Sequence, residues 1–504
     1  MQRDESNLTK TTYPVAIQRL EAASYPEMRP YHPHEAYPEY STPDLVGPRN
    51  EVYEAVRELF LRLGLDADGV GTAEWNPLGS VVRPGDHVFI KPNMIAHKHT
   101  DSDAWVDVIT HGSVIRPVVD YVHIALRGKG SITIGDAPQT DSIFEKIIAR
   151  MGLPELQAHY RDHLQFPIEV LDLRDEHWIE KDGIYVETVK LEGDPRGGVS
   201  VDLGHLSHFS DFDKKNKTYY GAFYDTAETN DHHSDGKHEY AISRTPIEAD
   251  VFIGIPKLKT HKKCGLTVNL KGLVGINANK NWLPHYCIGS PAEGGDQFPG
   301  NGARGKLENS VVLWMKKRLV KGSRPALFAA RKLKQLGYRV FGGTDKVVRS
   351  GNWHGNDTVW RMSVDLNRIL FYANPDGTLR SADSGKRFFS IVDGIVAMDG
   401  NGPVTGDPVD AGVLIAGDNP VSVDAVSAKV MGFDPARLPI IHCNLNDHEL
   451  PLFTGGYGNI STVSNHGPWQ RALDDWLPSE VLAFRPHFGW TGEIEWRAEP
   501  AANG

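Results

Sequence analysis

A run of basic, amide and histidine side chains follows one apolar stretch of the chain. Residues 249–255 predict a buried strand, and core packing beside such a strand does not need so many hydrogen-bonding side chains. A phosphate or carboxylate ligand would explain them. We take Lys259 and His261 as candidate catalytic residues. The candidate ligand-binding residues of this run are Lys257, Thr260, Asn269, Lys271, Asn277, Lys280 and His285.

The spacing of these residues predicts how they would bind an anion. Alternate side chains of a strand share a face, so Lys257 and Lys259 should point the same way. Their two ammonium groups repel each other unless an anion lies between them. His261 can act as an acid, a base or a metal ligand near neutral pH. Residues 267–274 are expected to begin a helix, whose free N–H groups would add to the anion affinity.

A second candidate segment is rich in glycine and lies at residues 392–406. It is expected to form a loop after a strand, with backbone N–H groups that can face a ligand. Asp393 and Asp399 could act in acid–base chemistry, hold a divalent ion, or form turns, and Gly402 is a candidate binding residue. The segment has neither a Walker loop nor a GxGxxG motif, so no nucleotide cofactor is assigned.

The elements that would position these segments alternate between strand and helix. Strands are expected at 88–90, 131–134, 168–171, 388–392 and 413–416, with helices at 50–63, 114–126, 143–151, 357–372 and 421–431. This alternation predicts an α/β fold with a mostly parallel or mixed sheet and helices on both faces, in Rossmann-like layers.

Polar side chains also stand at the ends of two of the expected strands. Lys91 and Asn93 follow the strand at 88–90, and Asp136 follows the strand at 131–134. Ligands of open α/β sheets bind beyond the carboxyl ends of the strands, so Lys91 and Asn93 join the candidate binding residues. Asp136 is expected to be either a helix N-cap or a ligand, and we name it with Asp393 and Asp399 as a candidate metal ligand.

The expected organisation is a core at 80–450 between an N-terminal extension at 1–79 and a C-terminal appendage at 451–504. A polar insertion at 196–250 is rich in His and Asp, which could bind a metal but is also typical of a solvated loop. A basic helical insertion at 304–339 is either a hairpin with a solvated face or a contact for a membrane surface or a lipid-linked substrate.

Composition narrows the function classes. The net charge of -11 argues against nucleic-acid binding, which needs a basic face. Cys264, Cys287 and Cys443 are widely spaced and form no CxxC pair, so neither a zinc ribbon nor a disulfide framework is indicated. The N-terminus has no apolar signal segment and the chain has no membrane-length apolar run. We expect a cytoplasmic protein, at most peripheral to a membrane.

The order of the motifs resembles the family known as domain of unknown function 362. The motifs are Lys-Pro-Asn at 91–93, Gly-Asp at 135–136, Pro-Lys-Leu-Lys-Thr-His at 256–261, Leu-Lys-Gly-Leu-Val-Gly at 270–275, Asp-Gly-Ile-Val-Ala-Met-Asp-Gly-Asn-Gly-Pro at 393–403, and Asp-Asn-Pro at 418–420. Some relatives carry ferredoxin-type modules, but this chain lacks the cysteine cluster, so no iron–sulphur cluster is expected. With Trp-Leu-Pro-His at 282–285 and Trp-His-Gly-Asn-Asp at 353–357, the chain also resembles longer members that are found alongside glycan and surface-polysaccharide biosynthesis. This resemblance implies a sugar-phosphate or lipid-linked substrate.

Together these observations predict an enzyme that acts on a small anionic, phosphorylated or carboxylated substrate. Group transfer, hydrolysis, and elimination or epimerisation all remain open, with a divalent metal ion as a candidate cofactor. The alternatives are a non-catalytic protein that binds an anionic glycan or a membrane surface, and a redox protein related to the iron–sulphur-associated family members.

Overall fold

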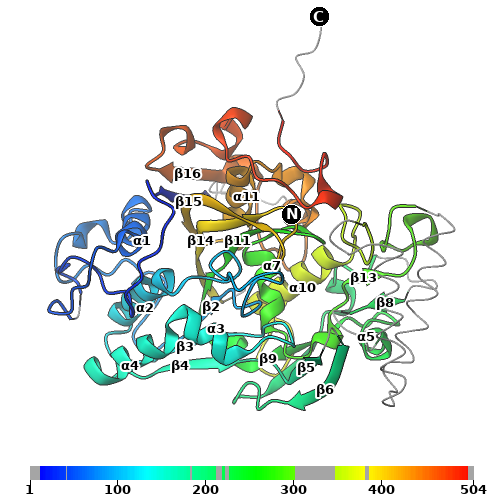
Figure 1. Cartoon of the computed structure of the whole chain (residues 1–504), viewed down its shortest axis with the longest axis horizontal. Helices are drawn as coiled ribbons and strands as arrows, with labels where there is room; N and C mark the ends of the chain where they lie inside the picture. The colour runs from blue at the N-terminus through cyan, green and yellow to red at the C-terminus, as the bar shows by residue number, and fades with distance from the viewer. Residues whose placement is uncertain are drawn as a thin grey trace, which may run out of the picture.

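A mixed β-sheet runs through the centre of the molecule in the computed structural model (Figure 1). The structure describes residues 12–40, 42–181, 184–211, 218–221, 226–300, 347–380 and 385–497. Within these ranges the sheet has ten strands. In spatial order they are β16 (Ile460–Ser464), β1 (Tyr13–Arg19), β15 (Asp407–Gly417), β14 (Arg387–Asp399), β10 (Val251–Ile255), β2 (His87–Pro92), β3 (Ser131–Asp136) and β4 (Ile168–Asp172), with β11 (Lys257–His261) and β12 (Gly265–Thr267) beside this row.

Strand directions make this an α/β sheet of mixed type. The pairs from β14 through β10, β2 and β3 to β4 are parallel, and β11 also runs parallel to β14. β15 is antiparallel to both β14 and β1, while β1 is parallel to β16. The predicted fold class is therefore confirmed. Segments from both ends of the described chain, β1 and β16, are strands of the same sheet as the central strands.

Alternation along the strands creates two apolar cores, one on each face of the sheet. In β10, Val251 and Ile253 enter the core that contains residues of α1 (Glu51–Arg62), α2 (Gly112–Leu126), α3 (Phe144–Met151) and α4 (Leu153–His163). Phe252 enters the opposite core, which contains residues of α7 (Asn269–Gly272), α10 (Val359–Tyr372) and α11 (Pro420–Met431). Figure 1 shows α1 to α4 on one side of the sheet and α7, α10 and α11 on the other.

The polar insertion expected at 196–250 contains regular structure in its described part. Its elements and their neighbours are β5 (Glu176–Lys181) with β6 (Ile184–Lys190), β7 (Gly198–Asp202) with β9 (Glu239–Ser243), β8 (Tyr219–Tyr220) with β13 (Tyr286–Cys287), α5 (Thr226–His232) and α6 (Arg244–Glu248). A short helix, α12 (Pro439–His442), follows α11. His232 contacts Glu239 at 2.7 Å, and the His233 ring contacts the Trp282 carbonyl at 2.8 Å. Within the described ranges no three His, Cys, Asp or Glu side chains gather as a metal-binding group.

Two local expectations were wrong. Residues 393–399 were expected in a loop but belong to β14, which extends to Asp399 because it pairs with β11 and β15. The helix expected at 267–274 is shorter, because Thr267 ends β12, α7 spans Asn269–Gly272, and a 3₁₀ turn spans Leu273–Ile276. The basic insertion at 304–339 lies outside the described residues. No helix in the described part of the chain is long and apolar enough to cross a membrane.

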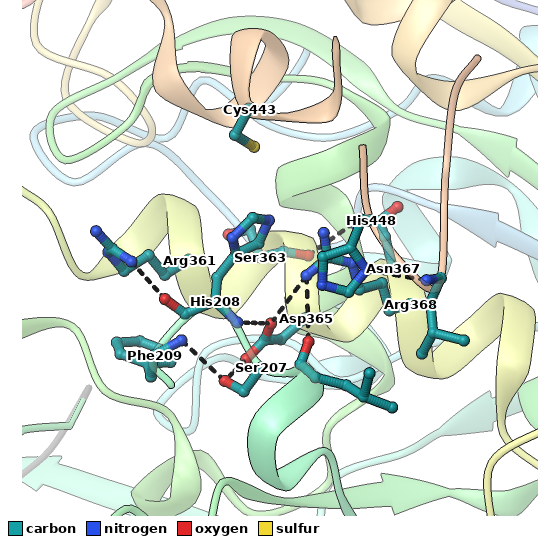
Figure 2. A network of polar contacts seen from close by, with 12 residues as sticks. Ser207, His208, Phe209, Arg361, Ser363, Asp365, Asn367, Arg368, Cys443 and His448 are labelled. Carbon is teal, nitrogen blue, oxygen red and sulfur yellow. Dashed lines mark hydrogen bonds and ion pairs between the residues drawn. The ribbon is translucent and has the colours of Figure 1, made fainter. Parts of the chain in front are cut away.

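A buried polar network fixes α10 against the turn that follows β7 (Figure 2). The Asp365 carboxylate accepts hydrogen bonds from the Ser207 hydroxyl at 2.5 Å, the His208 backbone N–H at 2.9 Å and the Tyr240 hydroxyl at 2.9 Å. The Arg368 guanidinium, also buried, lies 3.9 Å from the same carboxylate. The Nε of Arg368 has no hydrogen-bond partner among the described residues. Asp365 therefore supplies the charge that compensates a buried arginine.

Replacing this carboxylate should destabilise the fold. Asp365→Ala leaves Arg368 buried without its counter-charge and removes three hydrogen bonds, so we expect a loss of about 3 kcal/mol in the free energy of unfolding. Asp211 is a control, because it pairs with Arg361 while its side chain stays 77% exposed. Asp211→Ala should cost less than about 1 kcal/mol. Urea unfolding followed by circular dichroism measures both, and equal losses would contradict this role of Asp365.

Candidate functional site

A cavity of about 290 Å³ lies at the carboxyl ends of β2 and β3, beside β11. Side chains from segments far apart in the sequence meet around it. Those predicted from the sequence are Lys91, Asn93, Asp136, Lys259, His261, Lys271, Lys280 and His285. The position agrees with the general rule that open α/β sheets bind ligands beyond the carboxyl ends of their strands.

An ion pair between Lys91 and Asp136 forms one wall of the cavity. The Lys91 ammonium lies 2.9 Å from Asp136 Oδ1, and the carboxylate also accepts the backbone N–H groups of Met94 and Ala137. Gly275 packs directly on this pair, because a Cβ at position 275 would lie 1.6 Å from Asp136 Oδ1. The turn after α7 can approach the ion pair this closely only with glycine at that position.

Lys259 and Lys280 are held by backbone carbonyls. Lys259 donates to Val108 O at 2.6 Å and Pro403 O at 3.2 Å, and Lys280 donates to Val274 O and Asn277 O, both at 2.9 Å. The pKa of each ammonium group is lowered to about 7, mainly by burial and in addition by nearby lysines, including Lys271, while Asp136 opposes the change. Both groups therefore change charge near neutral pH.

Lys271 differs from these lysines because its ammonium has neither a hydrogen bond nor an ion pair within the described part of the chain. Lys271 is 8% exposed, so water replaces the missing partner only in part. Burial lowers its pKa, and the nearby Lys91 ammonium adds to this effect. A buried cation of this kind favours an anionic ligand in the cavity.

Two histidines face the cavity in opposite hydrogen-bonding states. His261 Nδ1 accepts the Lys263 backbone N–H at 3.1 Å, so a neutral ring carries its hydrogen on Nε2. His285 Nδ1 lies 2.9 Å from the Leu283 carbonyl, which can only accept, so its Nε2 carries the lone pair. Burial lowers the pKa of both rings well below 6.5, and the surrounding lysines lower it further. At neutral pH the pair is therefore one donor and one acceptor.

Lys257 and Asp393 lie in the core behind the cavity. The Lys257 ammonium lies 3.0 Å from Asp393 and 2.8 Å from the Tyr25 hydroxyl, and both charged side chains are fully buried. Tyr25 donates to the second Asp393 oxygen at 2.6 Å. The anion expected between the two strand lysines is thus, for Lys257, a carboxylate of the chain itself. The geometry makes this pair a brace between the N-terminal segment and the sheet.

Other predicted residues also have internal partners. The Asn269 side chain binds Asp424 at 3.0 Å and Ser390 at 2.7 Å, so it supports the start of α7. Burial raises the pKa of Asp424 to about 7, although its hydrogen bonds to Asn269 and Leu270 oppose the change. The Thr260 hydroxyl donates to the Gly400 carbonyl at 3.0 Å.

Asn277 and Gly402 also lie outside the cavity lining. Asn277 donates from its side chain to the Asn279 carbonyl at 2.5 Å. A Cβ at Gly402 would lie 2.2 Å from the Thr260 carbonyl oxygen. Gly402 therefore allows a close packing of two backbone segments rather than a ligand contact.

The three aspartates proposed as metal ligands do not share a site in the described structure. Asp136 pairs with Lys91, Asp393 with Lys257, and Asp399 with Arg485, whose guanidinium contacts both Asp399 oxygens. A basic partner on each carboxylate is a poor environment for a divalent cation, because the partner already neutralises the charge that the cation would need. These oxygens fit ion pairs better than a metal.

Several lining residues were not predicted from the sequence. Lys262 and Lys263 belong to the basic run after β10, so the signal that identified Lys259 also covered them. Gly275 ends the Leu-Lys-Gly-Leu-Val-Gly motif at 270–275, which contributed to the family resemblance, but its contact with the Lys91–Asp136 pair was not predicted. Arg349, Ser350 and Asn352 come from a segment with no motif, and only the folded chain brings them to the cavity.

Comparisons with known proteins found a family match and likenesses to solved structures. No curated protein matches the sequence. The lactate racemase apoprotein from Thermoanaerobacterium thermosaccharolyticum is similar in structure over 40% of this chain, with 12% sequence identity and a TM-score of 0.20. This chain covers 33% of that protein, and a likeness of this size carries no functional argument. Residues 212–429 match the family model described as Domain of unknown function (DUF362), which confirms the family resemblance over this part of the chain.

Proposed function

We propose that the protein is an enzyme that binds a small phosphorylated or carboxylated substrate in the cavity beside β11. The observation that carries the proposal is the buried Lys271 ammonium, which has no counter-charge bonded to it in the described chain and lines the same cavity as Lys259 and Lys280. Among the described lining residues, Asp136 is the carboxylate, and Lys91 already pairs with it. An anionic ligand would supply the missing negative charge.

The size of the cavity supports a small substrate. A volume of about 290 Å³ is at the lower end of the roughly 300–1,000 Å³ that small-molecule sites occupy. A polymeric glycan would not fit inside it, whereas one phosphate or carboxylate with a few further atoms would. A sugar-linked or lipid-linked substrate would therefore place its charged end here and extend outward.

The protonation states support catalysis as well as binding. His261 offers an Nε2–H donor and His285 an Nε2 acceptor, so together they could give and take a proton at a bound substrate. Lys259 and Lys280 have a pKa of about 7 and could also exchange protons near neutral pH. A protein that only bound an anion would not need groups poised in this way.

The alternative functions have less support. A glycan-binding or membrane-binding protein would rest on the basic segment 304–339, which lies outside the described residues. The redox alternative rests on iron–sulphur-associated family members, and the three scattered cysteines of this sequence form no such cluster motif. A redox function through the thiols themselves would need a reactive thiolate. Burial instead raises the pKa of the Cys264 and Cys443 thiols to about 12.

Removing the unpaired cation should weaken anion binding. Lys271→Met keeps much of the side-chain length but removes the charge, so we expect the affinity for inorganic phosphate to fall roughly tenfold or more. Isothermal titration calorimetry measures the change. Lys129→Met is the matched control, because Lys129 is exposed and distant from the cavity lining. Similar losses in both variants would show that the effect is only one of overall charge.

The affinity for a divalent anion should fall as the pH rises through about 7. Lys259 and Lys280 are cationic below that pH and lose their protons above it, so anion binding favours the low-pH form. Sulfate is the suitable probe because its charge is constant over this range. Titrations between about pH 6 and about pH 9 would measure the decline. Lys259→Met and Lys280→Met should each flatten it, and an unchanged affinity in the wild-type protein would contradict the assignment.

Binding and turnover should separate in the histidine variants. The substrate would first be identified by mass spectrometry of molecules that copurify with the protein, and turnover would then be assayed with that compound. His261→Gln and His285→Gln keep a hydrogen-bonding side chain but cannot carry a proton between partners, so turnover should fall by about 100-fold or more. Binding should remain within about threefold, since the lysines supply most of the affinity. Wild-type protein that binds the compound without changing it would support a binding protein instead.

A further inference from the structure

The cavity offers its ligand many donors and few acceptors. The lysine ammonium groups and His261 Nε2–H all donate. The side-chain oxygens of three lining residues, Asp136, Asn93 and Asn352, are already engaged. Asp136 accepts from Lys91, Met94 and Ala137, Asn93 Oδ1 accepts from the Ile95 N–H, and Asn352 Oδ1 accepts from the Arg349 N–H.

His285 Nε2 is an open acceptor of the lining. The Thr267 hydroxyl also has no hydrogen-bond partner in the described structure, but it can donate as well as accept, whereas His285 Nε2 can only accept. The Leu283 carbonyl fixes the hydrogen of the ring on Nδ1, and the backbone N–H of His285 donates to the Tyr220 carbonyl at 2.6 Å. The segment is also held by the Asn356 amide, which donates to the His285 carbonyl at 3.1 Å. Nε2 therefore presents a lone pair from a fixed position, and no donor in the described chain satisfies it.

We infer that the ligand carries a hydroxyl group close to its anionic group, so that the lysines bind the anion and His285 Nε2 accepts the hydroxyl hydrogen. The ligand class is a small hydroxylated phosphate or carboxylate. This inference rests on the proposed anion site and narrows its substrate. A simple anion would leave His285 Nε2 without a donor inside the occupied cavity, which costs binding free energy.

An amino group on the ligand could also donate a hydrogen bond to His285 Nε2, but its positive charge would be unfavourable there. Lys263, Lys271 and Lys280 are close enough to His285 to affect its charge state. A ligand ammonium beside His285 would meet the field of these cations and be repelled. The site should therefore select a hydroxyl group over an ammonium group of similar size.

A matched series of small anions tests this order. Ethyl phosphate, 2-hydroxyethyl phosphate and 2-aminoethyl phosphate differ only in the terminal group, and propionate, 3-hydroxypropionate and 3-aminopropionate form the carboxylate arm. Calorimetry on the full-length protein should show the hydroxyl member binding about fivefold tighter than the unsubstituted one, since one neutral hydrogen bond is gained. The ammonium member should bind weakest. If 2-hydroxyethyl phosphate binds more tightly than 3-hydroxypropionate, the natural anionic group is a phosphate, and the reverse order indicates a carboxylate.

Variants at position 285 separate the acceptor from the shape of the pocket. His285→Phe removes the acceptor and should abolish the preference for the hydroxyl member, while both phosphates still bind. His285→Gln provides an amide oxygen and should restore part of the preference. Equal binding of all members of the series to the wild-type protein would overturn this inference and leave the anion site standing. Failure of every anion to bind would overturn the proposed function as well.

Discussion

The burial of several ammonium groups around one small cavity is the constraint on which the rest of the site depends. Removing such a charge from water costs several kcal/mol unless other groups compensate it. The chain compensates these lysines to different extents. Lys91 has a carboxylate, Lys259 and Lys280 have pairs of backbone carbonyls, and Lys271 has no bonded partner in the described structure. Of these four lysines, Lys271 is therefore the one beside which the negative charge of a ligand is most favourable.

Backbone carbonyls can stabilise a buried ammonium group only if the surrounding backbone holds them in a fixed position. The carbonyls that hold Lys280 belong to the short turn after α7, and Gly275 lets that turn rest on the Lys91–Asp136 pair. The start of α7 is fixed from behind, because Asp424 on α11 accepts the backbone N–H groups of Asn269 and Leu270. The buried hydrogen bonds between Asp424 and the start of α7 thus position Lys271, which lies on α7 and faces the cavity. The cost of burying Asp424 is offset by a defined orientation of α7.

The sequence predicted the layers and the location of the site better than the roles of its residues. Apolar runs such as 88–90 and 249–255 are strong strand signals, and strand ends converge at one edge of a parallel sheet, so Lys91, Asp136 and Lys259 could be brought together by topology alone. The bonding partner of each lysine could not be predicted, because it depends on contacts between residues that are far apart in the sequence. Lys257 and Lys259 are two residues apart, yet Lys257 meets Asp393 and Lys259 meets carbonyls. β14 likewise extends beyond residue 392 because it pairs with β11 and β15. The glycine-rich sequence of this segment did not predict that pairing.

The contrast between Lys257 and Lys271 separates the framework from the site. Both are buried lysines of one basic run, and burial lowers the pKa of both. Lys257 has its carboxylate and a tyrosine hydroxyl in the core, so an added ligand could gain nothing from it. Lys271 opens onto the cavity beside a donor histidine and an acceptor histidine, and its charge is available to a ligand. A basic motif of this kind therefore serves two purposes at once, because the residues that are compensated internally hold the strand in place for those that are not.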